Sequence, residues 1–467
     1  MAAITPRVAI VGAGLSGLAV AFRLRALAPS ADIRVLEPRP HAGGNVGTEL
    51  HDGFRVETGP NGFLDSKPGM TRLCRDLGLA DRLIPASEGS RKNRFVFANG
   101  AVQKLPGSPL GILTTPLLSP LGKLEMLAEP FRRRPGTPPA DESVAAFARR
   151  RFGREAADIF VDALVTGIHA ADSEKLSLPA AFPRLAEFER THRSVLRGFL
   201  ASMRQKKRDA ASRGEKPSPQ RMWSFREGLQ VVVDALRERV PVTTGVRVTR
   251  LERAGGGWLV HGEGRDSWAA DAVVLTCHAP EQAAAVASLD PVLAADMAAI
   301  PYAKVAVAAL GYRASDVPGT LASDGFGYIA PQNTKRDVLG VQWCSSIFPD
   351  RAPPGFVLWR VLCGGASRPD VYDLPDDELV RKCHAEMQLA MGVTGPPAFV
   401  RVVRWPRAIP QYHVGHLARV DRIEAAVAKL PGLFVTGNAY RGVAMNDVAE
   451  QAEAIAGKVA NLASGHL

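Results

Sequence analysis

The sequence predicts an α/β protein whose central element is a parallel sheet, and three observations support this fold class. Residues 8–11 form a short aliphatic run that ends in a glycine-rich turn, and residues 33–37 return as a second apolar run. Residues 271–276 and 433–435 repeat the pattern later in the chain. Aliphatic runs without polar alternation are typical of strands that are buried on both faces, as parallel strands between helices are.

The turn after the first strand carries three glycines with separate physical roles. Gly12 permits a tight turn, Gly14 lets the backbone approach a pyrophosphate, and Gly17 lets the following helix pack closely on the strand. Glu37 ends the second strand about 20 residues later, where a carboxylate can accept hydrogen bonds from ribose hydroxyls. This unit predicts a site for FAD or NAD, because a carboxylate at residue 37 would repel the 2′-phosphate of NADP.

A second glycine pair, Gly43–Gly44, follows this acid. The pair is either a flexible turn or a second place where backbone runs close to a ligand, which an NAD site does not need. Together with the first motif and residues 54–63, it resembles the FAD-binding segment of the flavin amine oxidase superfamily. The resemblance implies FAD as the cofactor.

Composition and charge limit the function classes. The chain has 467 residues, 46% of them hydrophobic, which suits a globular protein of two or three domains. A net charge of +11 favours an acidic partner such as anionic lipid, a polycarboxylate substrate or nucleic acid. We predict no nucleic-acid binding, because the arginines are scattered and the sequence has no zinc-finger spacing or RNA-binding aromatic motif.

Cysteine usage and the N-terminus bear on location. Five cysteines without a Cys-x-x-Cys pair predict free thiols in a reducing compartment. The N-terminal residues run into the first strand without an apolar leader, and no apolar stretch reaches the roughly 18 residues that a membrane span needs. We therefore predict a cytoplasmic protein without a membrane span.

Two elements follow the dinucleotide unit. Residues 68–84 have helical spacing that ends at Gly78, and residues 93–102 predict a hairpin with a type I′ turn at Asn99–Gly100. Arg94 lies at the start of the hairpin's apolar strand. Either its aliphatic stem packs while its head is solvated, or its guanidinium grips a substrate carboxylate with two parallel hydrogen bonds.

Residues 105–131 form an apolar segment interrupted by prolines and followed by Arg132, Arg133 and Arg134. The prolines forbid one long helix. Apolar turns beside a positive cluster suit docking on an anionic bilayer surface, and the alternative is a layer that caps the core. The sequence leaves both interpretations open.

Helices are expected in the next section of the chain. Residues 141–153 have a capping residue, a helical body and a glycine stop, and more helix follows to residue 164. The helical pattern breaks at residues 166–170, where Gly167 is either a turn glycine or a place where a flat ligand passes close to the backbone. Residues 205–209 predict an exposed, charged loop.

The chain then returns to β structure. Residues 246–251 alternate, residues 255–257 turn and residues 258–260 return, which predicts a small ribbon before the strand at residues 271–276. Between residues 285 and 397 strands alternate with helices, which we interpret as a substrate domain. After the strand at residues 433–435, Gly437, a loop and a helix again form the geometry that points N–H groups at an anion.

Several separate motifs extend the resemblance to nearly the whole chain, which is similar to the oxygen-dependent protoporphyrinogen oxidases of this superfamily. The motifs are residues 59–63, 93–95, 141–153, 191–194, 324–327, 409–412 and 437–443. The resemblance implies a flavoenzyme, peripheral to a membrane, that removes six electrons from a porphyrinogen in haem or chlorophyll synthesis. It implies dioxygen as the acceptor and hydrogen peroxide as a product.

The resemblance also implies site residues. Arg94 would hold a ring propionate, and the apolar slot for the macrocycle would be lined by Gly167, Phe326, Gly327, Ile329 and Leu362. The residues that would hold FAD are Gly12, Ala13, Gly14, Ser16, Gly17, Glu37, Gly43, Gly44, Gly59, Pro60, Asn61, Val246, Trp405, Gly437, Asn438, Val443, Ala444, Met445 and Asn446.

No catalytic acid or base is expected, because pyrrole nitrogen stabilises the cation left when a bridging CH₂ gives a hydride to flavin. A metal is not expected either, since His413 and His416 have no third ligand nearby in the sequence. Two residues, His169 and Asp172, depart from the family pattern in the slot wall. By contrast, Asn45 stands where amine oxidases usually have arginine, which fits the porphyrinogen branch.

We predict three domains. A Rossmann-like FAD-binding domain with a parallel sheet and a β-ribbon takes residues 1–90, 221–284 and 398–467. A mixed α+β substrate domain takes residues 91–104 and 285–397, and a helical, membrane-associating subdomain takes residues 105–220.

The sequence leaves several functions open. The substrate is protoporphyrinogen IX or coproporphyrinogen III, which differ in two carboxylates, and an amine oxidase or desaturase on the same scaffold is a further alternative. A non-enzymatic alternative is a flavin-less escort protein of this fold, against which the intact glycines and Glu37 argue. Whether the protein forms a homodimer, and which inhibitors it binds, is also open.

Overall fold

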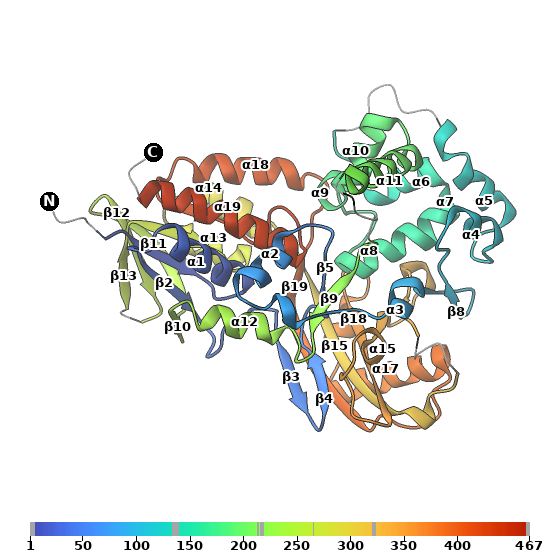
Figure 1. Cartoon of the computed structure of the whole chain (residues 1–467). Coiled ribbons are helices and arrows are strands. Elements are labelled where there is room, and N and C mark those ends of the chain that lie inside the picture. Colours follow the sequence, from blue (N-terminus) through green and yellow to red (C-terminus); the bar gives the residue numbers. More distant parts are fainter. Residues whose placement is uncertain are drawn as a thin grey trace.

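The computed structural model describes residues 5–132, 140–212, 214, 219–264, 266–319 and 324–463. Figure 1 shows a parallel sheet with its helices on the left, a larger sheet at the lower right and a helical region at the upper right. The predicted α/β fold class with a parallel sheet is confirmed. The predicted domain boundaries remain predictions.

The first sheet is fully parallel and contains the strands of the dinucleotide motif. Its order is β10 (Val242–Thr244), β2 (Asp32–Glu37), β1 (Arg7–Val11), β14 (Ala272–Leu275) and β20 (Leu433–Val435). Because its strands are mostly aliphatic and buried, both faces need a cover. One face packs against α1 (Leu15–Leu27), α2 (Gly69–Asp76), α12 (Gln230–Arg237) and α19 (Met445–Ala463).

A β-ribbon and three helices cover the other face of this sheet. The ribbon is β11 (Val248–Ala254), β12 (Gly257–Gly262) and β13 (Ser267–Ala270). The helices are α13 (Ala279–Val286), α14 (Pro291–Ala298) and α18 (His416–Val427). The carboxyl ends of the parallel strands therefore form one edge between two covered faces, which is where ligands bind in such sheets.

The second sheet has the order β19 (Phe399–Pro410), β15 (Tyr302–Arg313), β18 (Phe356–Gly364), β17 (Val338–Trp343), β16 (Gly327–Ile329), β7 (Phe95–Ala98) and β8 (Ala101–Lys104). Only β16 and β7 pair in parallel among these described strands. On one face, α17 (Asp376–Met391) covers a core that contains Trp343 and Trp359. The opposite face supplies one wall of the site described below.

The helical region contains α4 (Pro109–Thr114), α5 (Pro120–Leu127), η2 (Glu129–Phe131), α6 (Val144–Phe152), α7 (Arg154–Ala156), η3 (Ala157–Val161), α8 (Asp162–His169), α9 (Leu178–Ala181), α10 (Pro183–His192) and α11 (Val195–Ser212). A buried ion pair holds it together: Glu129 accepts from Arg151 and from the N–H of Val195, the latter at 2.9 Å. The carboxylate thus links η2, α6 and α11.

Shorter elements connect these parts. They are β3 (Thr48–His51), β4 (Phe54–Glu57), β5 (Phe63–Leu64), η1 (Ala80–Arg82), β6 (Leu83–Pro85), α3 (Glu88–Lys92), β9 (Met222–Phe225), η4 (Ala314–Asp316), η6 (Gln332–Thr334), α15 (Cys344–Ile347) and α16 (Pro369–Tyr372). β5, β9 and β6 form a small sheet that brings residues 63–64 beside residues 222–223.

Local structure confirms some predicted elements and corrects others. Asn99 and Gly100 both have positive φ, at 53° and 79°, as the predicted type I′ turn requires. The helical pattern does not break at residue 166: α8 continues to His169 and ends because Ala170 is left-handed. Gly167 is therefore a helical residue and not a turn glycine.

The exposed loop predicted at residues 205–209 is wrong as well, because these residues belong to α11. Glutamine, lysine and arginine have high helix propensity, and the segment continues a helix already started at Val195. The side chains are exposed, as predicted.

Candidate active site

The glycine loop after β1 is tightly built into the carboxyl edge of the parallel sheet. Gly12 has a φ of 105°, and a Cβ on Gly17 would lie 1.9 Å from the carbonyl oxygen of Gly12. Thr276, which follows β14, donates its hydroxyl to the carbonyls of Val11 and Gly12, each at 2.9 Å. Sequence reasoning did not assign Thr276 to the site, although it is the last residue of the strand predicted at residues 271–276 and so lies at this edge.

The two glycine motifs meet. Gly43 donates its N–H to the carbonyl of Ala13 at 2.8 Å. A Cβ on Gly44 would lie 2.9 Å from the Cα of Gly14. Two chain segments therefore cross with no side chain between them at the N-terminus of α1, where backbone N–H groups and the helix dipole favour a phosphate.

Glu37 is held in place at the end of β2. Its Oε2 accepts from the N–H of Ala13 at 2.8 Å, and its Oε1 accepts from Nε of Arg39 at 3.0 Å and from the Arg39 N–H at 3.2 Å. The N–H of Val246 donates to the Glu37 carbonyl at 3.0 Å. A carboxylate offers about four acceptor positions, so one remains for a ribose hydroxyl. The role of Arg39 was not predicted.

The last loop returns to the same edge. Gly437 has a φ of 118° and follows β20, and a Cβ there would lie 3.8 Å from Oγ of Ser16 on α1. The carbonyl of Asn438 accepts a hydrogen bond from the hydroxyl of Tyr412. Residues 443–446 lead into α19, so their N–H groups lie at a helix N-terminus.

Asn446 differs from this expectation in one respect. Its side chain is already used: Oδ1 accepts from the N–H of Met70 at 2.9 Å, and Nδ2 donates to the carbonyl of Leu64. Its amide therefore joins α19 to α2. Any contact that Asn446 makes with a cofactor would go through its backbone.

Residues 59–61 carry a polar group that is unsatisfied by the protein. Asn61 is 4% exposed, yet no described residue bonds to either its amide oxygen or its amide nitrogen. A Cβ on Gly59 would lie 1.7 Å from the carbonyl of Asn45, and the indole of Trp405 donates to the Thr58 carbonyl at 2.7 Å. Buried amides without hydrogen-bond partners are rare, so the side chain of Asn61 indicates that a bound group makes these hydrogen bonds.

These observations fit FAD. The glycine crossing and the helix N-terminus suit a pyrophosphate, Glu37 suits a ribose, and the buried amide of Asn61 suits a ring with hydrogen-bonding edges. Of the predicted cofactor residues, Gly12, Gly14, Gly17, Glu37, Gly43, Gly44 and Gly437 lie at this edge.

Strand register puts one wall of the predicted slot on the second sheet. Ile329 on β16 pairs with Gly340 on β17, Gly340 with Leu362 on β18, and Leu362 with Val307 on β15. Paired residues share a face, so Ile329 and Leu362 flank a position without a side chain. We call this apolar row, which crosses three strands, the trough.

Helix α8 lies against this trough. A Cβ on Gly167 would lie 2.5 Å from Cδ1 of Ile329, so glycine is what allows the helix to come this close. The neighbouring side chains Leu164 and Ile168 are 40% and 45% exposed. Helix α8 therefore packs on the trough through Gly167 and also carries two solvent-exposed apolar side chains.

Arg94 and Phe326 lie at one side of the trough. The guanidinium carbon of Arg94 is 5.0 Å from the centroid of the Phe326 ring, a cation–π contact. Within the described residues, no carboxylate pairs with Arg94, and partial burial lowers its pKa, although an arginine stays charged. Gly327 differs: a Cβ there would lie 1.9 Å from the Val341 carbonyl, so this glycine serves strand pairing.

A second row on the same face of the sheet is polar and was not predicted. Arg360 is two residues before Leu362, and it pairs in register with Gln342. Its guanidinium donates to Oε1 of Gln342 at 3.2 Å and to the carbonyl of Gly59 at 2.6 Å. The local signal is the arginine itself, which interrupts an otherwise apolar strand.

His169 points away from Gly167 around α8 and is also unsatisfied. It is 2% exposed, its ring contacts those of Phe182 and Tyr412, and no described residue bonds to either ring nitrogen. Burial lowers the pKa of His169 to about 4, so the ring is neutral near pH 7. Gln411 donates to the His169 carbonyl at 2.9 Å.

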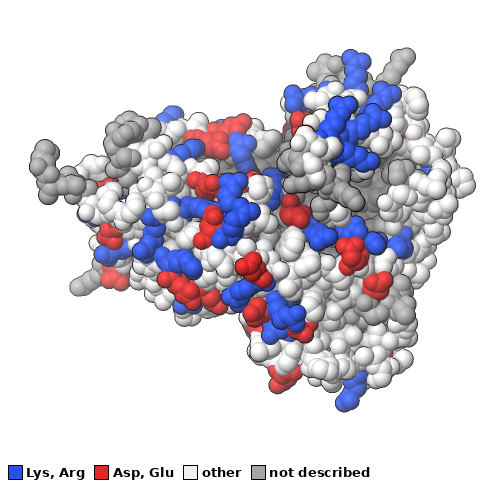
Figure 2. Space-filling view, in the orientation of Figure 1, with Lys and Arg blue, Asp and Glu red and all other residues white. Residues whose placement is uncertain are grey.

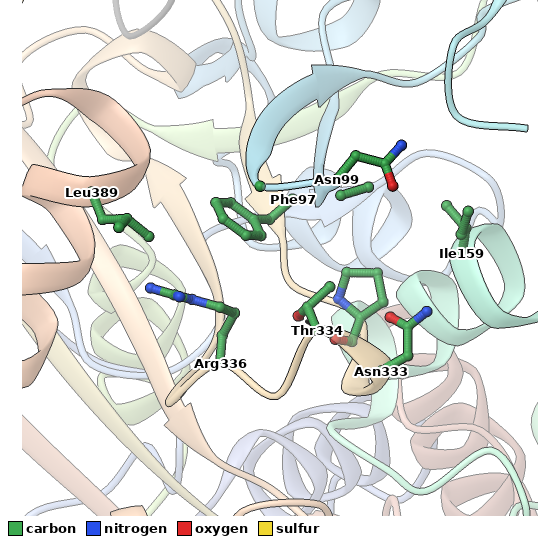
Figure 3. Close-up of a pocket in the computed structure, with 10 residues that line it drawn as sticks. Phe97, Asn99, Ile159, Asn333, Thr334, Arg336 and Leu389 are labelled. Carbon is green, nitrogen blue, oxygen red and sulfur yellow. Dashed lines mark hydrogen bonds between the residues drawn. The ribbon is translucent and has the colours of Figure 1, made fainter.

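A separate cavity of about 480 Å³ lies at the far end of β7 (Figure 3). Phe97 and Asn99 border it on one side, and Arg336, Thr334 and Asn333 on the other. Arg94 precedes β7 whereas Asn99 follows it, and none of the predicted slot residues lines this cavity. It is therefore distinct from the trough.

The helical region exposes a mainly apolar surface. Exposed side chains of α4, α5 and η2 are Leu110, Leu113, Leu121, Leu124, Leu127 and Phe131. Figure 2 shows that the edge where Figure 1 places α4 and α5 is mostly uncoloured, whereas lysines and arginines gather over α10 and α11. Arg132 is tied to the carbonyl of Arg150 at 3.0 Å, and Arg133 and Arg134 lie outside the described residues.

Among the described residues, no helix is both long enough and apolar enough to cross a bilayer. No group of three or more His, Cys, Asp or Glu there could hold a metal ion. His416 instead donates from Nε2 to the Tyr440 carbonyl, 2.8 Å away, and its ring stacks on Tyr412. The five cysteines are free thiols, and Sγ of Cys363 lies 3.4 Å from Sγ of Cys383.

Comparison with known proteins gives consistent results. A family model described as flavin-containing amine oxidoreductase matches residues 15–460. The chain is 29% identical to coproporphyrinogen III oxidase of Bacillus subtilis (strain 168), over 96% of each chain. It is 31% identical to the chloroplastic protoporphyrinogen oxidase of Nicotiana tabacum, over 97% of this chain and 85% of the relative.

The fold is also found in a crystal structure from Exiguobacterium sp. 255-15, whose assignment as a protoporphyrinogen oxidase is provisional. The TM-score is 0.82 at 22% identity, with 97% of this chain and 98% of the other covered. The likeness concerns the fold of the whole chain.

Proposed function

Because the chain belongs to the flavin-containing amine oxidoreductase family, so that its cofactor is FAD, we propose that it oxidises a porphyrinogen to a porphyrin. In the proposed reaction, protoporphyrinogen IX gives six electrons and six protons to three molecules of dioxygen. The products are protoporphyrin IX and three molecules of hydrogen peroxide. Both relatives named above carry porphyrinogen oxidase names and match nearly all of this chain, which supports the proposal.

The observation that carries the proposal is the apolar trough beside the cofactor edge. The row from Ile329 to Leu362, with α8 against it, offers a flat apolar surface to a macrocycle. Arg94, which no described acid neutralises, lies at its side and suits a propionate. A flat apolar ligand with anionic substituents matches this arrangement better than a small amine does.

FAD, when bound, would supply the hydride acceptor for the bridging CH₂ groups of the substrate, which are oxidised over three cycles. The protein binds and orients the macrocycle. Gly167 and Ile329 set the spacing of the slot, Phe326 and Leu362 exclude water from its faces, and Arg94 fixes the rotation of the macrocycle through one carboxylate. No acid–base residue is assigned, because no proton has to be taken from carbon before the hydride leaves.

We assign FAD to the residues that the resemblance implied, with two refinements. Asn61 would bond the ring through its unsatisfied amide, and Asn446 would act through its backbone because its side chain is occupied. Gly327 would act on the slot only indirectly, through the pairing of β16 with β17. The proposed FAD-binding, substrate and helical domains follow the boundaries given above.

Coproporphyrinogen III is the second candidate substrate. The B. subtilis relative carries that name, and it matches this chain over as large a share as the tobacco relative does. Coproporphyrinogen has two further carboxylates, so it would need cations besides Arg94 around the trough.

We also propose that the protein binds the surface of an anionic membrane. The exposed leucines of α4 and α5 and the basic side chains over α10 and α11 support this, because apolar insertion and positive charge together anchor a peripheral protein. The alternative for residues 105–131, a core cap, applies only to the few side chains that are buried, such as Leu117 and Leu118. A cytoplasmic location and a homodimer remain predictions.

The test is product fluorescence. Purified holoenzyme is given protoporphyrinogen IX and, separately, coproporphyrinogen III under air, and porphyrin emission is followed against an enzyme-free control that corrects for autoxidation. Hydrogen peroxide is measured in parallel, and three molecules per porphyrin are expected.

Two outcomes would contradict the proposal. A flavin-loaded protein that turns over neither porphyrinogen but oxidises an amine would favour an amine oxidase. A protein that is purified colourless and stays so after incubation with FAD would favour the flavin-less escort protein.

A further inference from the structure

Two arginines and one carboxylate lie in the same buried region of the protein. Arg351 and Arg360 are 0% and 2% exposed. Glu57 lies 3.3 Å from Arg351, and no described carboxylate lies within ion-pair distance of Arg360. Even with Glu57 ionised, the two guanidinium groups exceed it by one positive charge.

The neighbouring groups do not remove this excess. The Glu57 carboxylate already accepts two other hydrogen bonds, from the N–H of Leu229 at 3.0 Å and from the Thr48 hydroxyl at 2.7 Å. Cys344 faces both arginines, but burial raises the pKa of its thiol to about 11, so it is neutral. Arg360 itself bonds only to neutral oxygens, those of Gln342 and Gly59, and its Nε has no described partner.

An unpaired charge in the interior is costly, and proteins retain one where it meets an opposite charge that is present only in some states. Arg360 is held to the carbonyl of Gly59, and Asn61 with its unsatisfied amide is two residues further on. Along β18, Leu362 in the apolar trough is also two residues away and on the same face. The cation therefore lies where the proposed cofactor segment meets the proposed slot.

We propose that Arg360 is a positioning residue that holds the segment 59–61 against the flavin and places a buried positive charge beside the ring, which makes the flavin easier to reduce. The inference rests on the proposed location of FAD against residues 59–61. Taking up two electrons and one proton adds one negative charge to the ring. A fixed cation in a site of low dielectric favours that charge, and water screens it little.

The test measures the midpoint potential of the bound flavin and needs no porphyrinogen. Arg360→Gln removes the charge and keeps one donor. Gln342→Glu keeps the arginine but adds a carboxylate at the oxygen that now lies 3.2 Å from its guanidinium. Both variants are expected to lower the potential by about 30 mV or more, which is a tenfold change in the equilibrium of a two-electron couple.

Two further variants serve as controls. Arg360→Lys keeps the charge and should retain most of the potential. Arg91→Gln on α3 removes a half-buried arginine paired with Glu88 and should leave the potential unchanged. Should Arg360→Gln fail to fold, Gln342→Glu tests the same charge without removing the arginine.

The inference is overturned if Gln342→Glu and any folded Arg360→Gln keep the parent potential, or if Arg360→Lys lowers it as much as Arg360→Gln does. The location of FAD is tested separately by Asn61→Ala. If that variant retains flavin as firmly as the parent protein, the placement against residues 59–61 is wrong, whatever the potentials are.

Discussion

Gly44 and Gly14 touch backbone to backbone: a Cβ on Gly44 would lie 2.9 Å from the Cα of Gly14. The two residues belong to separate glycine motifs, 30 positions apart in the chain. Their contact fixes the segment after β2 against the N-terminus of α1, so that the two motifs form one surface, on which we propose that the diphosphate of FAD binds. Because of this contact, the Gly43–Gly44 pair is more than a flexible turn.

Gly44→Ala should therefore weaken flavin retention by tenfold or more. The new methyl group would meet backbone, which cannot rotate aside as a side chain can, and Gly44 has a φ of 64° that alanine disfavours. The measurement is the ratio of visible flavin absorbance to protein absorbance after gel filtration. Gly457→Ala in α19 is the matched control, because a Cβ there meets nothing within 4 Å.

Arg94→Ala should raise the KM for the porphyrinogen about tenfold or more and leave flavin content unchanged. The reason is the loss of a charged partner for one carboxylate, which is worth a few kcal/mol when partly desolvated. Steady-state kinetics measure the KM. The control is Arg91→Ala, at a half-buried arginine three residues earlier that pairs with Glu88. If both variants show the parent KM, Arg94 does not hold the substrate.

Gly167→Ala should reduce kcat/KM, because its methyl group would push Ile329, whose Cδ1 lies 2.5 Å from that position, into the slot. Ile329→Ala removes the Cδ1 atom that the new methyl group would clash with. In the double variant Gly167→Ala with Ile329→Ala, the alanine at residue 167 should therefore cost much less than it does alone. Equal costs in both backgrounds would mean that the Gly167–Ile329 contact does not set the width of the slot.

The cofactor edge was largely readable from the sequence, because it depends on local signals. A strand, glycines at fixed spacing and an acid at the end of the next strand occur within 30 residues, and each has a short-range physical reason. The slot was harder to read. Its residues come from α8 and from separate strands, and the predicted set came from resemblance, while the pairing of Ile329 with Gly340 and Leu362 needs the register.

What the sequence could not reveal depends on partners that are distant in the chain. In the sequence, Arg360 is a single charge in an apolar strand. Its role becomes clear only in the structure, where its guanidinium donates to the carbonyl of Gly59, 301 residues away. The prediction of a loop at residues 205–209 was wrong because it treated the high charge as a sign of irregular structure. The helix propensity of these residues favoured α11 instead. Neither long-range pairing nor the continuation of a helix can be recognised from a short stretch of sequence.

Glu129→Ala should lower the free energy of unfolding by about 3 kcal/mol, because it removes the closer carboxylate of the buried Arg151 and leaves it with Glu189, which lies 3.6 Å away and is shared with Arg150. The N–H of Val195 would lose its acceptor as well. Urea denaturation at fixed FAD concentration measures the loss. Glu125→Ala, which removes a half-exposed partner 3.6 Å from Arg132, should cost no more than about 1 kcal/mol.

Stability should fall between pH 6.5 and pH 4, in part because of His169. Burial lowers the pKa of His169 to about 4 in the folded protein, whereas an unfolded histidine titrates near 6.5, so the unfolded chain binds the extra proton in this range. The stabilisation is complete above pH 6.5 and is lost as the pH falls towards 4. For one such group, the free energy lost between pH 7 and pH 4.5 is about 2.5 kcal/mol.

His169→Phe should remove this part of the pH dependence, since a phenyl ring keeps the contacts with Phe182 and Tyr412 but does not titrate. The measurement is the difference in unfolding free energy between pH 7 and pH 4.5, which should shrink by about 2 kcal/mol relative to the parent protein. Phe182→Leu is the control, because it loosens the same packing without removing a proton site. It should lower stability similarly at both pH values, and an equal loss of pH dependence in both variants would show that His169 is not the titrating group.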